Sequence, residues 1–217
     1  MKSIAFVALL FCAIGFSSSN NLICNTPELD IPKEWVDMTH GCIGKMREQV
    51  LEELKASMQY MAMGAYFAKD VVNRPGVSEM FFKSASEERD HAIKLIHYLL
   101  MRGELTTNIS DLIKRNLVPP VTTWENVVSA MKAALKLEAD VTRKIRKVIE
   151  VCEHDTASNP SNNDYHLVDY LTGDFLEEQY HGQRDIAGKV STLEKMMKDH
   201  GKLGEWLFDK KVQAGEL

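Results

Sequence analysis

Apolar residues recur at alternating steps of three and four along four stretches of the chain, which is the spacing of helices packed in a bundle. The stretches cover residues 46–67, 81–99, 128–149 and 175–197, and the fourth is the weakest. A short amphipathic stretch follows at residues 202–211. The pattern therefore predicts an all-α chain with four long helices and a short fifth helix.

The breaks between these stretches predict how the helices connect. "NRPG" at 73–76 and "SNPSNND" at 158–164 are turn sequences, so each separates the two antiparallel helices of a hairpin. The link from Gly103 to Trp124 contains "VPP" and is long enough to run the length of the bundle. The expected connectivity is two hairpins joined by one long crossover, whereas cytokine bundles need two such crossovers.

Each apolar stripe is interrupted by a side chain that can bind a metal ion. The interruptions are Glu53, Glu88, Glu138 and Gln179. The midpoint of Glu53 and Glu88 falls just before "NRPG", and the midpoint of Glu138 and Gln179 falls inside "SNPSNND", so each pair should lie at about one height in its hairpin. His91 follows Glu88 by three residues and shares its side of the helix. With the crossover closing the bundle, we expect all of these side chains in one layer.

Tyr60, two turns beyond Glu53, adds a phenol to this layer. Carboxylates buried without partners are costly, and three of them close together repel one another. A polyvalent cation offsets both effects, and carboxylates with imidazole but no thiolate suit iron, manganese or zinc. A single Glu-x-x-His is common on exposed helices, but four interruptions at paired heights predict a metal site.

The fourth helix allows two registers. Glu178 and His181 form a second Glu-x-x-His, and if both faced inward the site would be symmetric. Steps of seven from Gln179 reach apolar residues, whereas the same steps from Glu178 reach polar ones. This phase favours Gln179 as the inward residue, with the Glu178 register as the alternative.

With 217 residues and a net charge of −5, the chain has room for one or two domains, and its slight acidity argues against nucleic acid or an anionic membrane as the main partner. Lys2, the apolar run 4–16 and the small residues after it form the pattern of a secretory signal peptide, with cleavage before Asn20. That run is too short to cross a bilayer, and no later stretch is long and apolar enough. The expected division is signal peptide 1–19, N-terminal extension 20–34 and helical domain 35–217.

Secretion makes the cysteines candidates for disulfide bonds. Cys12 leaves with the signal peptide, and Cys24, Cys42 and Cys152 remain. An odd number implies a bond to another chain or a free thiol. Asn108, in "NIS", is the single candidate glycosylation site.

These residues resemble the ferritin family over about Trp35 to Lys211. The segments that carry the resemblance are "LEELKASMQYMAMGAYF", "FFKSASEERDHAIKLI", "TWENVVSAMKAALKLE", "FLEEQYHGQRDI" and "WLFDKK". With the signal peptide and the extra cysteines, the chain is similar to the heavy-type subunits of secreted, insect-like ferritins. The resemblance implies a ferritin-like four-helix bundle with one long crossover and a short C-terminal helix.

The resemblance also implies a ferroxidase centre that binds two irons inside the bundle. Glu53, Glu88 and His91 match the ligands of the first iron. Glu88 also matches the ligand that bridges the two irons, and Glu138 matches the ligand of the second iron. The implied activity is oxidation of Fe(II) by dioxygen, followed by storage of Fe(III) as a mineral inside a shell of 24 subunits. A subunit with a structural or iron-carrying role and no catalysis is the alternative.

Two further matches complete this set. Gln179 corresponds to a residue that orients water or dioxygen near the second iron, and Tyr60 to one that supports the ligands of the first iron. Light-type chains of the family lack several of these residues. Their presence therefore implies a catalytic, heavy-type subunit.

Other positions depart from the family pattern. Glu87 and Asp90 match acids that nucleate the mineral on the cavity face, but the third matching position is Ile93. Asp169 matches one acid of the three-fold entry channel, whereas Thr172 stands at the second acidic position. We expect a partner light-type subunit to supply the missing acids.

The crossover topology also predicts a disulfide bond. Cys42 lies near the start of the first helix and Cys152 near the end of the third, each on its apolar stripe. These two helix ends lie together in a bundle with one crossover. We therefore expect an intrachain Cys42–Cys152 bond and an interchain role for Cys24.

Overall fold

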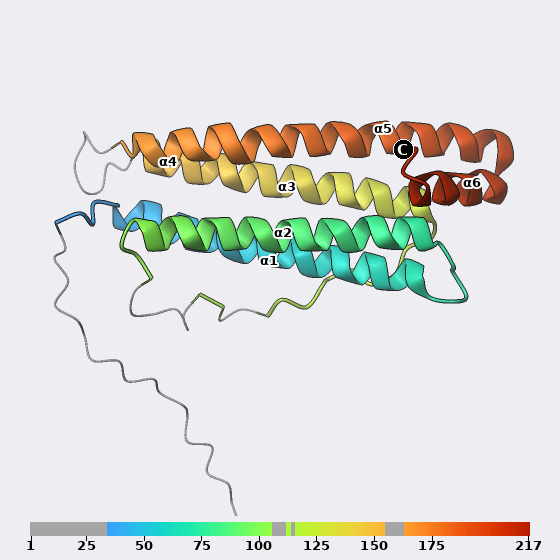
Figure 1. The fold of residues 1–217 in the computed structure, drawn as a ribbon, viewed down its shortest axis with the longest axis horizontal. Coiled ribbons are helices and arrows are strands. Elements are labelled where there is room, and N and C mark those ends of the chain that lie inside the picture. Colours follow the sequence, from blue (N-terminus) through green and yellow to red (C-terminus); the bar gives the residue numbers. More distant parts are fainter. Residues whose placement is uncertain (1–33, 106–111, 114–115, 155–162) are drawn as a thin grey trace, which may run out of the picture. The chain divides into compact units, whose positions relative to one another are not determined.

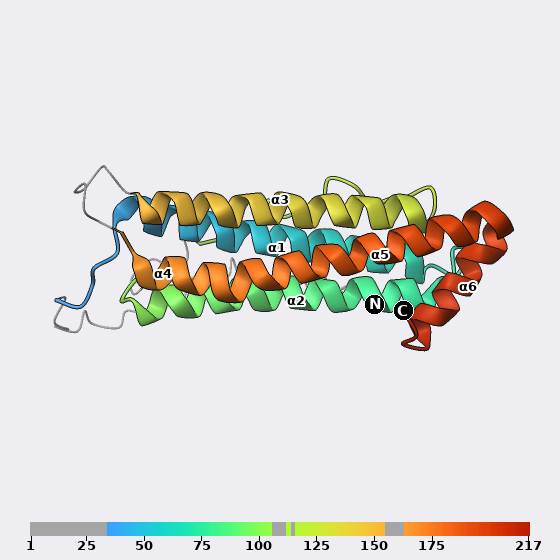
Figure 2. The ribbon, with the colours of Figure 1, turned by 90° about the horizontal axis from the view of Figure 1, so that it is seen from above.

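Four long helical segments form a bundle of two antiparallel hairpins, and a short helix crosses one end of it (Figures 1 and 2). The computed structural model describes residues 34–105, 112–113, 116–154 and 163–217, which lie in one compact unit. The helices are α1 (His40–Ala68), α2 (Pro75–Met101), α3 (Val127–Glu153), α4 (Tyr165–Tyr170), a π-helical segment (Leu171–Leu176), α5 (Glu177–His200) and α6 (Lys202–Gln213). The predicted all-α bundle with a short last helix is confirmed.

The first hairpin is α1 with α2, and the second is α3 with the continuous run from α4 to α5 (Figure 1). One long connection leads from Met101 to Val127, as the sequence predicted. The last part of this connection lies against α1, where Gln59 Nε2 donates to the main-chain oxygen of Val121 at 2.7 Å. The crossover is therefore attached to the bundle by side chains of the first helix.

The run from α4 to α5 contains a π-helical segment because its inward residues follow one another at steps of four. Leu167, Leu171, Phe175 and Gln179 are all buried. Twelve residues of α-helix make about 3.3 turns, so Gln179 would point about 120° away from Leu167. The wider turns of the π-helical segment keep all four side chains on the inner face.

The buried apolar side chains fall into two clusters along the bundle. One cluster surrounds Cys42 and Cys152 and includes Leu95 and Ile145, and the other lies toward α6 and includes Phe208. Along α2, α3 and α5, the polar interruption of the apolar stripe comes where the helix passes from one cluster to the other, and on α1 Glu53 comes shortly before that passage. The apolar core thus leaves one polar layer near the middle of the bundle.

The end of the bundle where α2 finishes is fastened by a disulfide bond. Cys42, in α1, is bonded to Cys152, in α3, and the two residues are 110 apart in the sequence. Both are almost completely buried. The predicted intrachain bond is therefore confirmed, whereas Cys24 and Asn108 lie outside the described residues.

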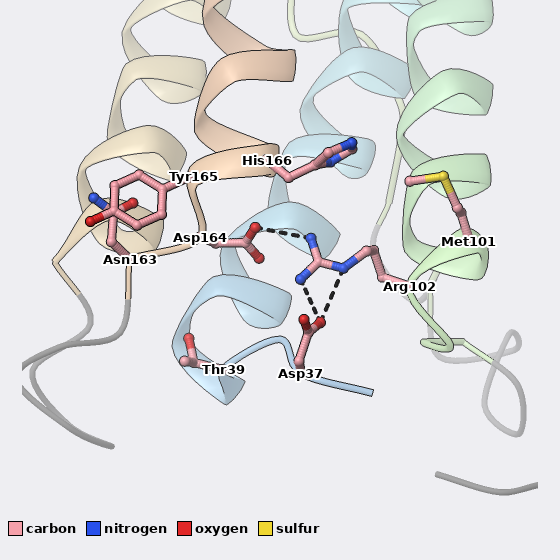
Figure 3. A pocket seen from close by; sticks show the side chains of 8 residues that line it. All are labelled: Asp37, Thr39, Met101, Arg102, Asn163, Asp164, Tyr165 and His166. Atoms are coloured by element: carbon pink, nitrogen blue, oxygen red, sulfur yellow. Dashed lines mark hydrogen bonds and ion pairs between the residues drawn. The ribbon is translucent and has the colours of Figure 1, made fainter. Parts of the chain in front are cut away.

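Arg102, one residue beyond α2, joins three segments at the same end (Figure 3). Its guanidinium donates to Asp37 at 2.6 Å, to Asp164 at 2.9 Å and to the Tyr98 hydroxyl at 2.9 Å. Asp164 also accepts from the main-chain N–H of Leu167 and so caps α4. One arginine therefore ties the segment before α1 and the start of α4 to the end of α2.

At the opposite end, α6 supplies acids to the beginnings of two other helices. Glu205 accepts from the N–H of Val127, the first residue of α3, at 3.1 Å. Asp209, which is 0% exposed, accepts from the N–H of Val77 in the first turn of α2 at 3.0 Å. The contact is close, since a Cβ at Gly76 would lie 2.2 Å from the main-chain oxygen of Asp209. Each carboxylate thus caps a helix that is distant in the sequence.

Replacing Asp209 tests this long-range cap. We expect Asp209→Ala to lower the free energy of unfolding by about 2 kcal/mol, because a buried N–H of α2 loses its acceptor. Asp209→Asn keeps an acceptor oxygen and should lose less. Thermal and denaturant unfolding of the two variants measure the difference, and equal stability of the two would contradict the capping role.

Candidate metal centre

Two helices bring three metal-binding side chains together in the polar layer. Glu53 comes from α1, and Glu88 and His91 come from successive turns of α2. They are 0%, 3% and 6% exposed. One ligand atom from each lies within 4.8 Å of the others. The predicted level pairing of Glu53 with Glu88 across the hairpin therefore places both beside His91.

Several atoms of this group have no hydrogen-bond partner within the described part of the chain. They are Glu53 Oε2, Glu88 Oε2 and His91 Nδ1, and each is buried. Glu53 Oε1 is satisfied, because Gln49 Nε2 donates to it at 2.8 Å. His91 Nδ1 and Glu88 Oε2 are 3.7 Å apart. Since buried polar atoms are normally satisfied, three such atoms together fit the ligands of a cation.

The second hairpin adds Glu138 and Gln179, which are 7% and 4% exposed. The Tyr60 hydroxyl, from α1, donates a short hydrogen bond to Glu138 Oε1. Gln179 Oε1 lies 2.8 Å from the Thr142 hydroxyl, one turn beyond Glu138 on α3. The structure thus buries all six predicted centre residues, and the hydrogen bond from Tyr60 to Glu138 joins the two hairpins at the centre.

Burial and mutual repulsion hold these acids toward their neutral forms. Burial, followed by the charge of Glu138, raises the pKa of Glu88 to about 8. Burial and the Glu88 carboxylate raise the pKa of Glu53 well above its ordinary range. Burial also raises the pKa of Glu138. A cation bound among them would favour the charged forms, so metal binding at neutral pH should release protons.

The register of α5 is settled by exposure. Gln179 is buried, whereas the side chains of Glu178 and His181 are 53% and 77% exposed. The Gln179 register is confirmed, and the symmetric alternative is wrong. Glu178 nevertheless reaches the edge of the centre, because its Oε1 lies 3.2 Å from His91 Nε2.

Sequence reasoning missed three polar side chains that contact the predicted set: Gln49, Thr142 and Gln183. A signal was present for Gln49 and Thr142, which lie one helical turn from Glu53 and Glu138 on the same faces. Gln183 stands in the same relation to Gln179, but it is half-buried at the edge of an otherwise exposed helix surface, so its apolar surroundings did not mark it.

The structure does not bring the remaining candidates into the centre. Glu87 and Asp90 are exposed on α2, with side chains 49% and 59% exposed. Ile93 is 43% exposed, and Asp169 and Thr172 are exposed on the run from α4 into the π-helical segment. Their roles in mineral nucleation and iron entry stay predictions.

Comparison with known proteins identifies relatives over the whole chain. A model of the ferritin-like domain matches residues 43–196. The chain is 54% identical to the ferritin heavy chain of Papilio xuthus, over 100% of both chains, and 54% identical to that of Trichoplusia ni, over 98% of both. The solved structure of Trichoplusia ni secreted ferritin matches with a TM-score of 0.83 and 56% identity, over 88% of this chain and 97% of that one. This chain belongs to the ferritin family.

Proposed function

We propose that this chain is a ferroxidase subunit of a secreted ferritin, which oxidises Fe(II) with dioxygen at a di-iron centre and stores Fe(III) as a mineral. The observation that carries the proposal is that Glu53, Glu88 and His91 bring ligand atoms within 4.8 Å of one another, and that each residue has a buried atom without a hydrogen-bond partner among the described residues. Relatives that share about half of its residues are named ferritin heavy chains.

In this proposal Glu53, Glu88 and His91 hold the first iron. Glu88 has its second oxygen free to bridge toward a second iron, which Glu138 would hold. The ligands are fixed before iron arrives, because they project from long helices and are packed between two apolar clusters. Such preorganisation limits the motion that must be lost on binding.

Tyr60 and Gln179 complete the centre from opposite hairpins. Tyr60 donates to Glu138 and so keeps one carboxylate oxygen oriented, and the buried Gln179 would lie beside the second iron. Two Fe(II) ions together give two electrons to dioxygen, which takes up two protons to form hydrogen peroxide. The chain contributes adjacent open positions for the reactants and a site shielded from bulk water.

The assembled form we propose is a 24-subunit shell built with homologous subunits, including a light-type chain. Ferritins assemble from homologous subunits into shells. Thr172 and Ile93 stand where acids of the entry channel and the nucleation surface are expected, which favours a partner that supplies them. Cys24 would form the bond to that partner.

We propose secretion because of the N-terminal pattern and because a relative of high identity is a secreted ferritin. Residues 1–19 would be removed as a signal peptide, 20–34 would form an extension, and 35–217 would form the bundle domain. Asn108 would then meet the glycosylation machinery. Within the described residues, no helix has the length and apolarity needed to span a membrane.

The direct test is the rate of Fe(II) oxidation in air, followed by the absorbance of the ferric product. We expect Glu88→Ala combined with His91→Ala to slow the initial rate roughly 100-fold, because two ligands are lost. Glu79→Gln removes an exposed acid of the same helix and should keep the wild-type rate. Equal rates in the double variant and the wild type would refute catalysis and favour a structural or iron-carrying subunit.

A further inference from the structure

Gln179 is hydrogen-bonded to Thr142, which is hydrogen-bonded in turn to the half-buried Gln183. The Thr142 hydroxyl oxygen lies 2.8 Å from Gln179 Oε1, and Gln183 Nε2 lies 2.7 Å from the same hydroxyl oxygen. Gln183 Nε2 also lies 3.1 Å from the main-chain oxygen of Gln179. Thr142 is buried, so these contacts replace water as its hydrogen-bond partners.

The Thr142 hydroxyl has one proton and two acceptors in reach. Gln179 Oε1 and the main-chain oxygen of Glu138 are both 2.8 Å from it. Gln183 Nε2 can only donate, so it occupies one lone pair of the hydroxyl whichever acceptor receives the proton. The hydroxyl therefore donates its hydrogen bond either to the main-chain oxygen of Glu138 or to Gln179 Oε1. Which acceptor it uses constrains the orientation of the Gln179 amide.

Depending on which acceptor the Thr142 hydroxyl uses, either the oxygen or the nitrogen of the Gln179 amide faces Thr142. If the hydroxyl donates to Gln179, the amide oxygen must face Thr142 and the amide nitrogen is free to face the carboxylates. If the hydroxyl donates to the Glu138 main chain, the amide nitrogen can donate to Thr142 and the amide oxygen faces the centre. A half turn of one side-chain torsion interconverts the two arrangements.

We propose that Thr142, supported by Gln183, is a positioning residue that sets which end of the Gln179 amide faces the metal centre. The inference rests on the proposed ferroxidase function. The structure has the first arrangement, with the amide oxygen on Thr142.

The two arrangements suit two states of the centre. A carboxylate without a cation gains from the amide N–H, whereas a bound cation, or a water molecule on it, gains from the amide oxygen. Thr142 satisfies both because its hydroxyl proton can turn from one acceptor to the other while Gln183 keeps donating. Gln179 can thus serve as a donor before iron binds and as an acceptor afterwards.

The test compares Thr142→Val with Thr142→Ser. Valine keeps the shape and removes the hydroxyl, and we expect about a tenfold lower kcat for Fe(II) oxidation, with shell assembly unchanged. Serine keeps the hydroxyl and should restore the rate to within about twofold of the wild type. Gln183→Leu should fall between them, and it preserves the test if Thr142→Val fails to assemble.

Two further measurements separate positioning from a general structural effect. The visible spectrum of Co(II) bound at the centre should change in Thr142→Val and stay as in the wild type in Thr142→Ser. In a Gln179→Ala background, Thr142→Val should have little further effect, because its target is absent. The inference would be overturned if Thr142→Val lowered kcat by the same factor in the wild-type and Gln179→Ala backgrounds. It would also be overturned if Thr142→Val and Gln183→Leu both kept the wild-type rate. Neither result would contradict the proposed ferroxidase function. A wild-type protein whose oxidation does not depend on Glu88 would overturn the proposed function and this inference with it.

Discussion

Glu88→Gln should make the metal-free protein more stable at pH 8, although it removes an iron ligand. The pKa of Glu88 rises from an ordinary 4.5 to about 8 in the folded chain, so folding favours its protonated form. This contribution to stability is complete below pH 4.5 and is lost as the pH rises toward 8. Glutamine has the same shape without a charge, and we expect it to recover on the order of 2 kcal/mol at pH 8.

The measurement is the thermal unfolding midpoint in the presence of a chelator, at pH 5 and pH 8. The unfolding midpoint of Glu88→Gln should exceed that of the wild type by little at pH 5 and by more at pH 8. A divalent cation added without oxygen should raise the wild-type midpoint more than that of the variant, and so narrow or reverse the gap. A variant that is less stable than the wild type at pH 8 with chelator would show that the acids are not a source of repulsion.

Removing the Cys42–Cys152 bond should cause the largest loss of stability in the chain. The bond closes a loop with a sequence separation of 110, so it restricts a large part of the unfolded chain. We expect the combined change Cys42→Ala and Cys152→Ala to lower the free energy of unfolding by about 4 kcal/mol. Both side chains are buried, and small cavities add to the loss.

Denaturant unfolding with and without a reductant isolates the effect of the bond. Reductant should bring the wild type close to the double variant and leave the double variant unchanged. Cys24→Ser is the matched control, because it removes a thiol and keeps the intrachain bond. If the double variant unfolds at the wild-type denaturant concentration, the bond does not stabilise the bundle.

The strongest sequence signals were those in which several weak patterns had to agree. Glu88 alone looked like an ordinary acid on a helix, and its distance from the turn paired it with Glu53. The crossover topology, in which the start of the first helix meets the end of the third, placed Cys42 beside Cys152, and the structure contains that bond. Chain geometry set by helix length and turn position is therefore readable from a single sequence.

The fourth stripe began at Phe175, although the helical run begins at Tyr165, and the cause is one that periodicity could not reveal. A search at the α-helical period assumes a constant turn, but the segment Leu171–Leu176 is π-helical. Leu167 and Leu171 are buried on the inner face, although they fall out of phase with the residues of α5 at that period. Helical spacing places Thr142 and Gln183 one turn from Glu138 and Gln179, but the hydrogen bond between them depends on side-chain rotamers across two helices, which a sequence pattern does not give.

The acids of α6 are translated late, so the caps that they provide can form only near the end of synthesis. The N–H of Val77 and the carboxylate that caps it are separated by 132 residues, and α2 has no side-chain cap of its own at its first residue. A ribosome makes α2 long before it makes Asp209, so the growing chain carries α2 without this cap until its last segment emerges. The helix that presents Glu88 and His91 is therefore completed by nearly the last residues to be translated.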